Sequence, residues 1–297
     1  MAALNEDERQ AILQDERDAN EREKLNKKYF RRLNNQQQQQ QYLASSRNPD
    51  GIQPQIIGGT TVVGPSVYPF FASIASGATE LCGGSLVAPD LILTAAHCNG
   101  TAYFPGGRAI IDAYRLETPI TGYSHVVSVL RIVQHPLYIP FHNDLMLVKF
   151  APPVTTIQPT ILNFNTSLPP ASAQLTIMGF GSTADQSSSG SYSYAQTLQH
   201  ATVPIQPWKQ CHASFPMAIR NQHICVEGSN PQRITCAGDS GGPLMWGSQL
   251  QVGVLSYGAA TCTDGPSVFT RTSRFAGWLK FAMCNLSNFR PAGSVRC

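Results

Sequence analysis

From residue 56 onward, short apolar segments alternate with turn-forming residues along the chain. The segments are three to eight residues long and rich in β-branched side chains, and they cover 70–75, 84–87, 91–94, 126–133, 145–150, 174–178, 244–246 and 251–256. Segments this short, separated by Gly, Pro, Asn and Asp, predict the strands of a β-barrel or sandwich.

Two further patterns organise this region. A Pro-rich stretch, 152–170, separates two similar halves and is typical of a connection between them. Near the C-terminus, Phe275, Trp278, Leu279 and Ala282 follow the spacing i, i+3, i+4 and i+7. This spacing predicts a C-terminal helix with one face packed against the body of the protein.

The first 55 residues have a different character. Residues 1–50 hold 9 of the 18 acidic and 9 of the 21 basic residues, and a Gln tract covers Gln36–Gln41. Apolar residues are too sparse between Glu6 and Leu33 for a buried stripe. We therefore expect residues 1–55 to form a charged helical or disordered arm or pro-segment, with a partner-binding helix as the alternative.

The whole-chain composition excludes several classes of protein. Charged residues make up only 13% of the 297 residues, which argues against a coiled coil. A net charge of +3 does not suggest a nucleic-acid partner. No apolar run approaches the roughly 18 residues of a membrane-spanning helix, so we expect no membrane span.

The cysteines indicate an oxidising compartment. All eight lie after residue 81 and none forms a C-x-x-C pair, which favours disulfides over a structural zinc site. Asn99, Asn165 and Asn285 begin Asn-x-Ser/Thr sequons, which fit a secreted chain. No apolar signal-peptide segment follows Met1, but the cysteines carry more weight, and we expect a secreted protein without a metal or cofactor.

Three short motifs carry candidate chemistry. His97 lies in the motif Leu93–Cys98 at the end of an apolar strand, Asp144 leads directly into an apolar segment, and Ser240 lies within Gly238–Pro243. Each motif alone has a structural explanation: a core histidine, a cap, or a Gly-rich hairpin. Together they supply the nucleophile, base and carboxylate of acyl transfer.

The chemistry explains why these residue types are needed. A Ser hydroxyl becomes a useful nucleophile when a neighbouring base takes its proton, and neutral His can do so near pH 7. A buried carboxylate holds the ring in the right tautomer. Glycines beside the Ser allow backbone N–H groups, here those of Gly238 and Ser240, to bind the oxyanion.

The chain from Ile56 to about Met283 resembles the chymotrypsin-like (trypsin-fold) serine proteases. The order His97, Asp144, Ser240 and the motifs T-A-A-H-C and G-D-S-G-G-P match that family. The resemblance implies an all-β fold of two antiparallel six-stranded barrels, at about 56–160 and 161–283, with a C-terminal helix and a tail at 284–297. The active site would lie between the barrels.

The same resemblance implies activation from a zymogen. Ile56 begins a segment, Ile-Ile-Gly-Gly, that is similar to the family's mature N-terminus, and its new ammonium would pair with Asp239. Gln55 stands where the family usually has Arg or Lys, so the activating protease is unknown. N-terminal sequencing of active material would show whether a chain begins at Ile56.

The resemblance also implies the substrate-binding residues Ile234, Thr235, Ser256, Tyr257, Gly258 and Ser267. Ile234 would form the base of the pocket, where it cannot pair with a substrate cation. Ser267 stands where the family often has Gly and would narrow the pocket. We therefore expect cleavage after medium to large apolar residues, with elastase-like preference for smaller residues as the alternative.

Three disulfides follow from the resemblance: Cys82–Cys98, Cys211–Cys225 and Cys236–Cys262. Cys284 and Cys297 lie outside the family's common set, and they could close a C-terminal loop, or Cys297 could bond another chain. Sequence alone allows 105 pairings of eight cysteines.

The leading hypothesis is a secreted serine endopeptidase acting on proteins or peptides, with protein protease inhibitors as further partners. A narrow-specificity cascade protease whose arm recruits partners is an alternative. A non-catalytic homologue that acts as a binding protein is another, which the intact His97, Asp144 and Ser240 disfavour.

Overall fold

The computed structural model describes residues 59–76, 80–99, 107–116, 119–182, 194–227, 235–259, 262, 265–289, 291, 293, 295 and 297. These residues belong to one compact unit, Gln53–Cys297. The predicted arm, the proposed N-terminus Ile56 and the pocket residue Ile234 lie outside the described residues.

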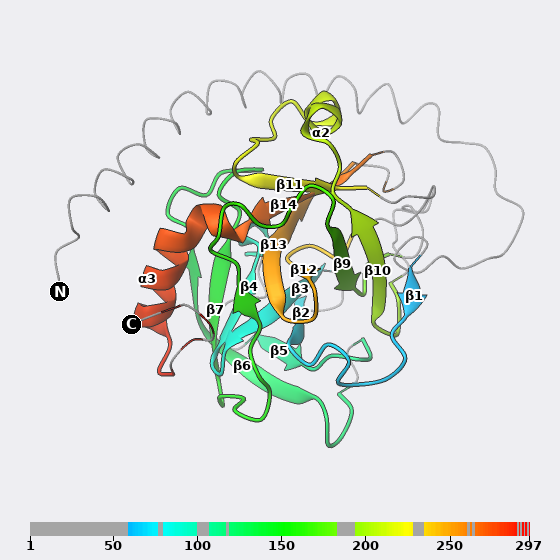
Figure 1. Cartoon of the computed structure of the whole chain (residues 1–297). Coiled ribbons are helices and arrows are strands. Elements are labelled where there is room, and N and C mark those ends of the chain that lie inside the picture. The colour runs from blue at the N-terminus through cyan, green and yellow to red at the C-terminus, as the bar shows by residue number, and fades with distance from the viewer. Residues whose placement is uncertain are drawn as a thin grey trace, which may run out of the picture. The chain divides into compact units, whose positions relative to one another are not determined.

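The first half of the domain is a closed antiparallel barrel in the strand order β2-β3-β4-β7-β6-β5 (Figure 1). The strand bounds are β2 Phe71–Ser76, β3 Glu80–Ala88, β4 Leu91–Thr94, β5 Arg108–Ile111, β6 His125–Gln134 and β7 Met146–Ala151. All four residues of β4 are buried, and β4 pairs with both β3 and β7. This strand therefore exposes neither its side chains nor its backbone edges to solvent.

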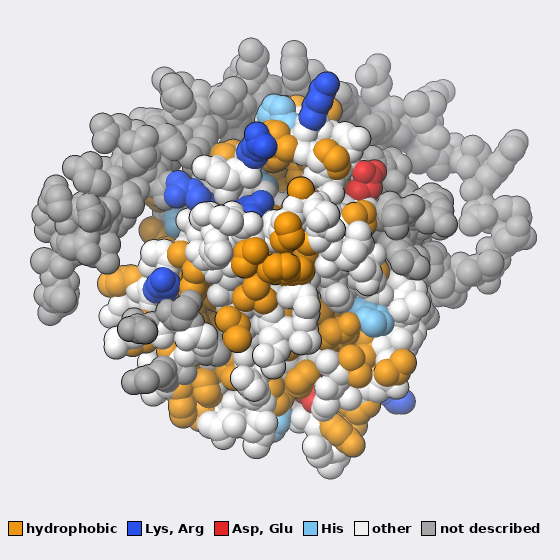
Figure 2. Space-filling model, viewed as in Figure 1, with side chains coloured by type: hydrophobic (Ala, Val, Ile, Leu, Met, Phe, Trp, Pro, Cys, Tyr) orange, Lys and Arg blue, Asp and Glu red, His pale blue; other side chains and the backbone are white. Residues whose placement is uncertain are grey.

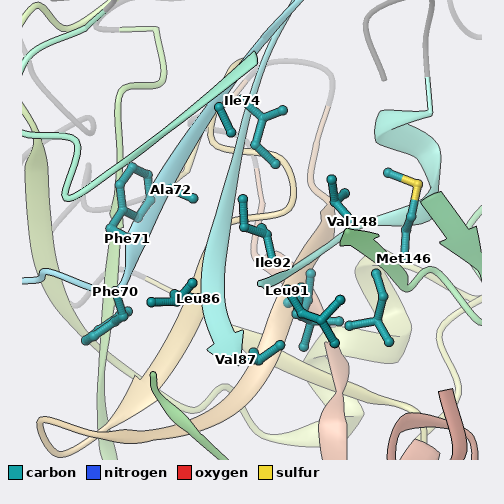
Figure 3. Packing of buried hydrophobic residues seen from close by; sticks show 14 of the residues in the cluster. Phe70, Phe71, Ala72, Ile74, Leu86, Val87, Leu91, Ile92, Met146 and Val148 are labelled. Carbon is teal, nitrogen blue, oxygen red and sulfur yellow. The ribbon is translucent and has the colours of Figure 1, made fainter. Parts of the chain in front are cut away.

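The barrel interior is filled by aliphatic and aromatic side chains from successive strands. Figure 3 shows side chains of β2, β3, β4 and β7 packed together, including Phe71, Ile92 and Val148. In β6, by contrast, Val127 and Val129 are buried and their neighbours Val126 and Leu130 are exposed, as a strand with one solvent face requires. The core therefore follows from strand alternation and closure.

The second half is a sheet in the order β1-β10-β9-β12-β13-β14-β11, to which β8 adds a parallel pairing with β13. The bounds are β1 Thr60–Thr61, β8 Ile161–Leu162, β9 Gln174–Gly179, β10 Gln199–Pro204, β11 His223–Val226, β12 Pro243–Trp246, β13 Leu250–Tyr257 and β14 Ser267–Arg271. Strand pairing among the described residues leaves this sheet open. The predicted all-β architecture is confirmed, with one closed barrel and one open sheet of eight strands.

The helices lie at the periphery (Figure 1). They are the short 3₁₀ turns η1 Ala96–Cys98 and η2 Thr272–Phe275, and the α-helices α2 Trp208–Ser214 and α3 Ala276–Leu286. The predicted C-terminal helix is confirmed as α3, whose Leu279, Ala282 and Met283 are buried in the same core cluster as the barrel. Its apolar face therefore joins the end of the chain to the first half.

A buried polar cluster also holds the end of α3. Asp90 is 2% exposed and pairs with Lys149. It also accepts hydrogen bonds from Ser287 Oγ at 2.5 Å and from the Asn288 backbone N–H at 2.9 Å. With both oxygens bonded, the desolvation of this carboxylate is compensated.

Four disulfides brace the domain: Cys82–Cys98, Cys211–Cys225, Cys236–Cys262 and Cys284–Cys297. The first three are the pairs that the resemblance implies. The fourth closes the C-terminal tail onto α3.

Candidate active site

His97 leaves the barrel where β4 ends. Thr94, the last residue of β4, is buried and donates its hydroxyl to the Gly83 carbonyl oxygen of β3 at 2.8 Å. The chain then turns through η1, where the Cys82–Cys98 disulfide ties the following residue back to β3. The His97 side chain remains 31% exposed, so its ring is fixed at its base and accessible to solvent.

Asp144 orients His97 through two hydrogen bonds. Its Oδ2 lies 2.7 Å from His97 Nδ1, and its Oδ1 accepts the His97 backbone N–H at 2.8 Å. Ser256 of β13 donates its hydroxyl to Oδ2 at 2.5 Å. The carboxylate is 1% exposed, so three donors replace its water shell and fix the direction of both oxygens.

The electrostatics of this pair favour the protonated ring. Burial alone lowers the pKa of His97, but the charge of Asp144 and its hydrogen bond to the ring outweigh that effect, so the pKa lies above the ordinary 6.5. Because Asp144 binds Nδ1, a neutral ring carries its proton there and leaves Nε2 as an acceptor. The arrangement can take a proton at Nε2 and stabilise the imidazolium that forms.

The loop that bears Ser240 is held against the strand ends that lead to His97. The Ser240 carbonyl accepts the backbone N–H of Gly83 at 2.7 Å, and the Gly241 N–H donates to the Leu255 carbonyl at 3.0 Å. A Cβ on Gly241 would lie 2.1 Å from Thr94 Oγ1 and 3.1 Å from the Ala95 nitrogen. The Gly-rich loop therefore packs directly on the segment from which η1 begins.

Replacing Gly241 by Ala is expected to disrupt this contact. Gly241 has a φ of +76°, and the new Cβ would also lie 2.6 Å from the Gly83 carbonyl oxygen. Backbone strain and overpacking each cost about 1–3 kcal/mol, so we expect a loss of about 3 kcal/mol in the free energy of unfolding. Displacement of the loop by about 1 Å would lower kcat/KM about a hundredfold.

The control for this prediction is Gly277→Ala in α3. A Cβ there meets nothing within 4 Å, and in the first turn of α3 Ala should be neutral or stabilise the helix by up to about 1 kcal/mol relative to Gly. Urea unfolding and peptide hydrolysis would be measured for both variants. Equal stability and activity of the two variants would contradict the close packing at Gly241.

The conformation of the same loop decides which of its backbone N–H groups have acceptors. Gly238 has a φ of +95°, and the N–H groups of Asp239 and Gly242 donate to the carbonyls of Cys236 and Asp239. Within the part of the chain that the structure describes, no acceptor takes the N–H groups of Gly238 and Ser240. Two donors in one loop are thus left for an oxygen outside the protein backbone.

Asp239 is buried behind this loop. It is 1% exposed, and its two oxygens accept the backbone N–H groups of Gly181 at 2.7 Å and Cys236 at 2.9 Å. Burial raises its pKa from 3.8 to about 6, and the two hydrogen bonds offset only part of that effect. Gly179 and Gly181 are required beside it, because a Cβ on either would lie about 2 Å from a carboxylate oxygen.

The predicted substrate-binding residues lie at the ends of β13 and β14 and beside Cys236. Thr235 Oγ1 and Ser267 Oγ lie 2.6 Å apart, and Ser267 is fully buried. A Cβ on Gly258 would contact only the Pro266 carbonyl oxygen, at 3.7 Å, so there is free space beside the Gly258 Cα. The structure therefore gathers Thr235, Gly258 and Ser267 beside the Cys236–Cys262 disulfide.

The surroundings of Tyr257 include residues that sequence reasoning missed. The rings of Phe141, Phe215 and His223 stand edge-on to Tyr257, with centroid distances of 5.0, 5.4 and 5.7 Å. Edge-to-face contacts of this kind hold an aromatic ring in a fixed orientation. No local signal in the sequence could have found them, because the three residues come from separate loops and a strand.

Neither a metal-binding cluster nor a membrane-spanning helix is found among the described residues. No group of three or more His, Cys, Asp or Glu residues is placed there to hold a metal ion. No helix within it is long and apolar enough to cross a membrane.

Comparison with known proteins gives a consistent result. The family model described as Trypsin matches residues 56–279. Trypsin II-P29 of Gallus gallus is 34% identical over 233 residues, covering 76% of this chain and 88% of that protein. Serine protease 1 of Rattus norvegicus is 31% identical over 232 residues, covering 76% of this chain and 89% of that protein.

A solved structure supports the same relationship. Neuropsin, a serine protease expressed in the limbic system of mouse brain, superposes with a TM-score of 0.66 and 27% sequence identity. The match covers 76% of this chain and 98% of neuropsin. The chain therefore belongs to the trypsin family of serine proteases.

Proposed function

We propose that this chain is a serine endopeptidase in which Ser240 is the nucleophile, His97 the general base and acid, and Asp144 the carboxylate that orients His97. The observation that carries the proposal is the buried Asp144 carboxylate 2.7 Å from His97 Nδ1, beside the loop that holds Ser240. This arrangement supports the removal of a proton by Nε2 at neutral pH.

The reaction proceeds in two halves. Ser240 Oγ attacks the carbonyl carbon of the scissile peptide as its proton passes to His97 Nε2, and the imidazolium then protonates the leaving amine. Water, deprotonated by the same nitrogen, attacks the acyl-enzyme and releases Ser240. The N–H groups of Gly238 and Ser240 bind the oxyanion in both tetrahedral intermediates, a contribution worth about a hundred- to a thousandfold in rate for each donor.

For specificity, we propose cleavage after medium to large apolar residues. The relatives include proteins named trypsins, but the residues that the family resemblance assigns to the pocket here are Ile234, Thr235 and Ser267, none of which is acidic. The Thr235 and Ser267 hydroxyls hydrogen-bond each other and are uncharged, so neither can neutralise a substrate cation. The backbone of Ser256–Gly258 would pair with the substrate as an added strand, and Tyr257 would contact its side chains.

A panel of peptide substrates tests this specificity. We expect kcat/KM for Leu, Met, Phe or Tyr at the cleaved position to exceed that for Arg by about a hundredfold or more, because burying an unpaired cation is costly. Preferred cleavage after Arg would contradict the pocket assignment. Preferred cleavage after Ala or Val would replace it with the elastase-like alternative.

For activation, we propose that the chain is a zymogen in which cleavage before Ile56 frees an ammonium that pairs with Asp239. The buried carboxylate, whose described donors are two uncharged N–H groups, supports this role. The four disulfides fit an extracellular setting, and the proposed partners are protein or peptide substrates, protein inhibitors and an activating protease.

The pH dependence of stability tests the role of Asp239. Since its folded pKa is about 6 against 3.8 when unfolded, folding is favoured below pH 3.8, and that contribution is lost as the pH rises to 6. In the uncleaved chain the loss amounts to about 3 kcal/mol, and Asp239→Asn should remove this slope. In material cleaved before Ile56, the wild-type slope should also vanish, because the ammonium stabilises the charged carboxylate.

The proposed chemistry itself is tested by labelling. A peptidyl phosphonate should modify the activated protein on Ser240 alone, as shown by mass spectrometry of the digested protein. The uncleaved chain should react at least a hundredfold more slowly. Labelling of another residue, or no labelling of processed protein that is folded, would contradict the assignment of the nucleophile.

A further inference from the structure

A cleft in the second half of the domain has the composition of an anion site. It has a volume of about 710 Å³ and is lined by Thr166, Pro169, Ile219, Arg220, Asn221, Arg271 and Arg274. Three of the seven lining residues that the structure describes are arginines, and none of these seven is acidic. Figure 2 shows several Lys and Arg side chains over the upper part of the face in view, with one acidic patch at its upper right.

Acidic side chains elsewhere in the described chain are engaged with other partners. Asp90 pairs with Lys149, Asp112 accepts hydrogen bonds from Ser66, and Glu227 accepts one from Gln206. The other two, Asp144 and Asp239, belong to the active site. Arg220 and Arg271 therefore have no carboxylate partner among the described residues.

Arg271 is held in place at the cleft, and none of the described side chains supplies a counter-charge. Its Nη1 donates to the Leu168 carbonyl at 3.2 Å, whereas its buried Nε has no hydrogen-bond partner within the described structure. Burial lowers the pKa of its guanidinium. A cation that has lost part of its hydration and lacks a counter-ion is stabilised when an anion binds beside it.

The walls of the cleft are rigid. The Arg271 N–H donates to the Gln222 carbonyl at 2.7 Å, which ties the turn bearing Arg220 to the end of β14. On the other wall, Asn163 Nδ2 bonds the carbonyls of Asn165 and Leu168, each at 3.1 Å. A site whose donors are already fixed loses little entropy when its ligand binds.

Arg274 adds a third positively charged side chain to the lining. Burial lowers the pKa of His135 to about 4, and the charge of Arg274 adds to this effect. His135 packs against Phe275 and Trp278, at the start of α3. The guanidinium of Arg274 is thus close enough to His135 to disfavour a second positive charge there.

We propose that this cleft binds a tetrahedral oxyanion, phosphate or sulfate, with Arg220 and Arg271 as the principal ligands. The planar guanidinium fork matches the oxygen spacing of such groups, and several arginines favour them over a single carboxylate. Thr166 and Asn221 add hydroxyl and amide donors at the rim. The site is separate from the proposed catalytic residues.

The test is calorimetric titration of the full chain with inorganic phosphate at constant ionic strength. We expect saturable binding that Arg220→Ala weakens about tenfold or more, since a charge-assisted hydrogen bond is lost. Arg220 is exposed, so this variant should fold normally. Arg271→Lys keeps the charge but loses the fork, and it should also weaken binding.

The matched control is Arg131→Ala, which removes one exposed arginine from β6 of the barrel. Its affinity for phosphate should stay within twofold of the wild type. Absence of saturable binding, or an equal loss in Arg131→Ala and Arg220→Ala, would overturn the proposal. Hydrolysis of small peptides should be unchanged in Arg220→Ala. A failure of the anion-site proposal would therefore leave the proposed protease function untouched.

Two further ligands distinguish the source of the oxyanion. Tighter binding of a disulfated disaccharide than of free phosphate, again dependent on Arg220, would support a ligand that carries several such groups. Equal affinity per group would support a free ion. A peptide of residues 1–23, which contain eight acidic and three basic residues, tests whether the cleft binds an acidic peptide instead of a tetrahedral oxyanion. Binding of that peptide without binding of phosphate would overturn the proposal.

Discussion

Replacing Ser240 by Ala is expected to lower kcat for peptide hydrolysis by about six orders of magnitude. The hydroxyl is the proposed nucleophile, and without it His97 and Asp144 have no group to activate, so the three residues fail as a unit. Residual hydrolysis of about a thousandfold over water should persist from substrate binding and the oxyanion donors. Steady-state kinetics with an apolar peptide substrate measure this loss.

The fold should tolerate this change. The contacts that position residue 240 are made by its backbone carbonyl with Gly83, and Ala retains them. Ser214→Ala, at an exposed position of α2, serves as the control and should keep full activity. Substantial hydrolysis by folded Ser240→Ala would disprove the assignment of Ser240.

Asp144→Asn is expected to lower kcat/KM by about ten-thousandfold near neutral pH. The Asn amide would donate to His97 Nδ1, which forces the ring proton onto Nε2 and leaves no acceptor for the Ser240 proton. The carbonyl oxygen of Asn can still accept one of the existing hydrogen bonds, so the fold should survive. The defect should therefore appear in kcat rather than in the free energy of unfolding.

The pH profile separates this mechanism from simple distortion. In the wild type, kcat/KM should rise with pH through the raised pKa of His97, above 6.5, because the base must be neutral. Without the charge of Asp144, burial lowers the pKa of His97 unopposed, so the inflection should move below 6.5. Asp112→Asn is the control, since Asp112 bonds Ser66 and its φ of +56° suits Asn. An inflection that does not move would show that Asp144 does not set the pKa of His97.

Most strands with several apolar and β-branched residues were predictable from the sequence, but β10 and β11 were not. The segment 91–94 corresponds to β4, and 174–178 lies within β9. By contrast, β10 contains Gln199, which is 1% exposed and bonds Thr61 across the sheet. β11 begins with His223, which is 2% exposed. Polar residues in a buried strand are satisfied by partners far along the chain, so their burial leaves no local signal.

In the candidate site, too, some features were predictable from the sequence and others were not. The residue types and motifs around His97, Asp144 and Ser240 predicted the chemistry, because acyl transfer demands these groups. The positions of Phe141 and Phe215 beside Tyr257, and the contact of Ser256 with Asp144, could not be predicted before folding. Ser256, for example, is 112 residues from Asp144 and yet donates to its Oδ2.

By itself, the sequence determined which groups are available: a hydroxyl among glycines, an imidazole after an apolar strand, eight cysteines, and arginines scattered over the chain. Only the tertiary structure decided which of them meet and which are desolvated. Asp144 and Asp239 are both 1% exposed, but their partners differ. Asp144 is bonded by His97 and Ser256, whereas Asp239 accepts two backbone N–H groups. Likewise, Arg220 and Arg271 line one cleft only because β11 pairs with β14. The reason is that charge, pKa and reactivity depend on burial and on neighbours distant in sequence.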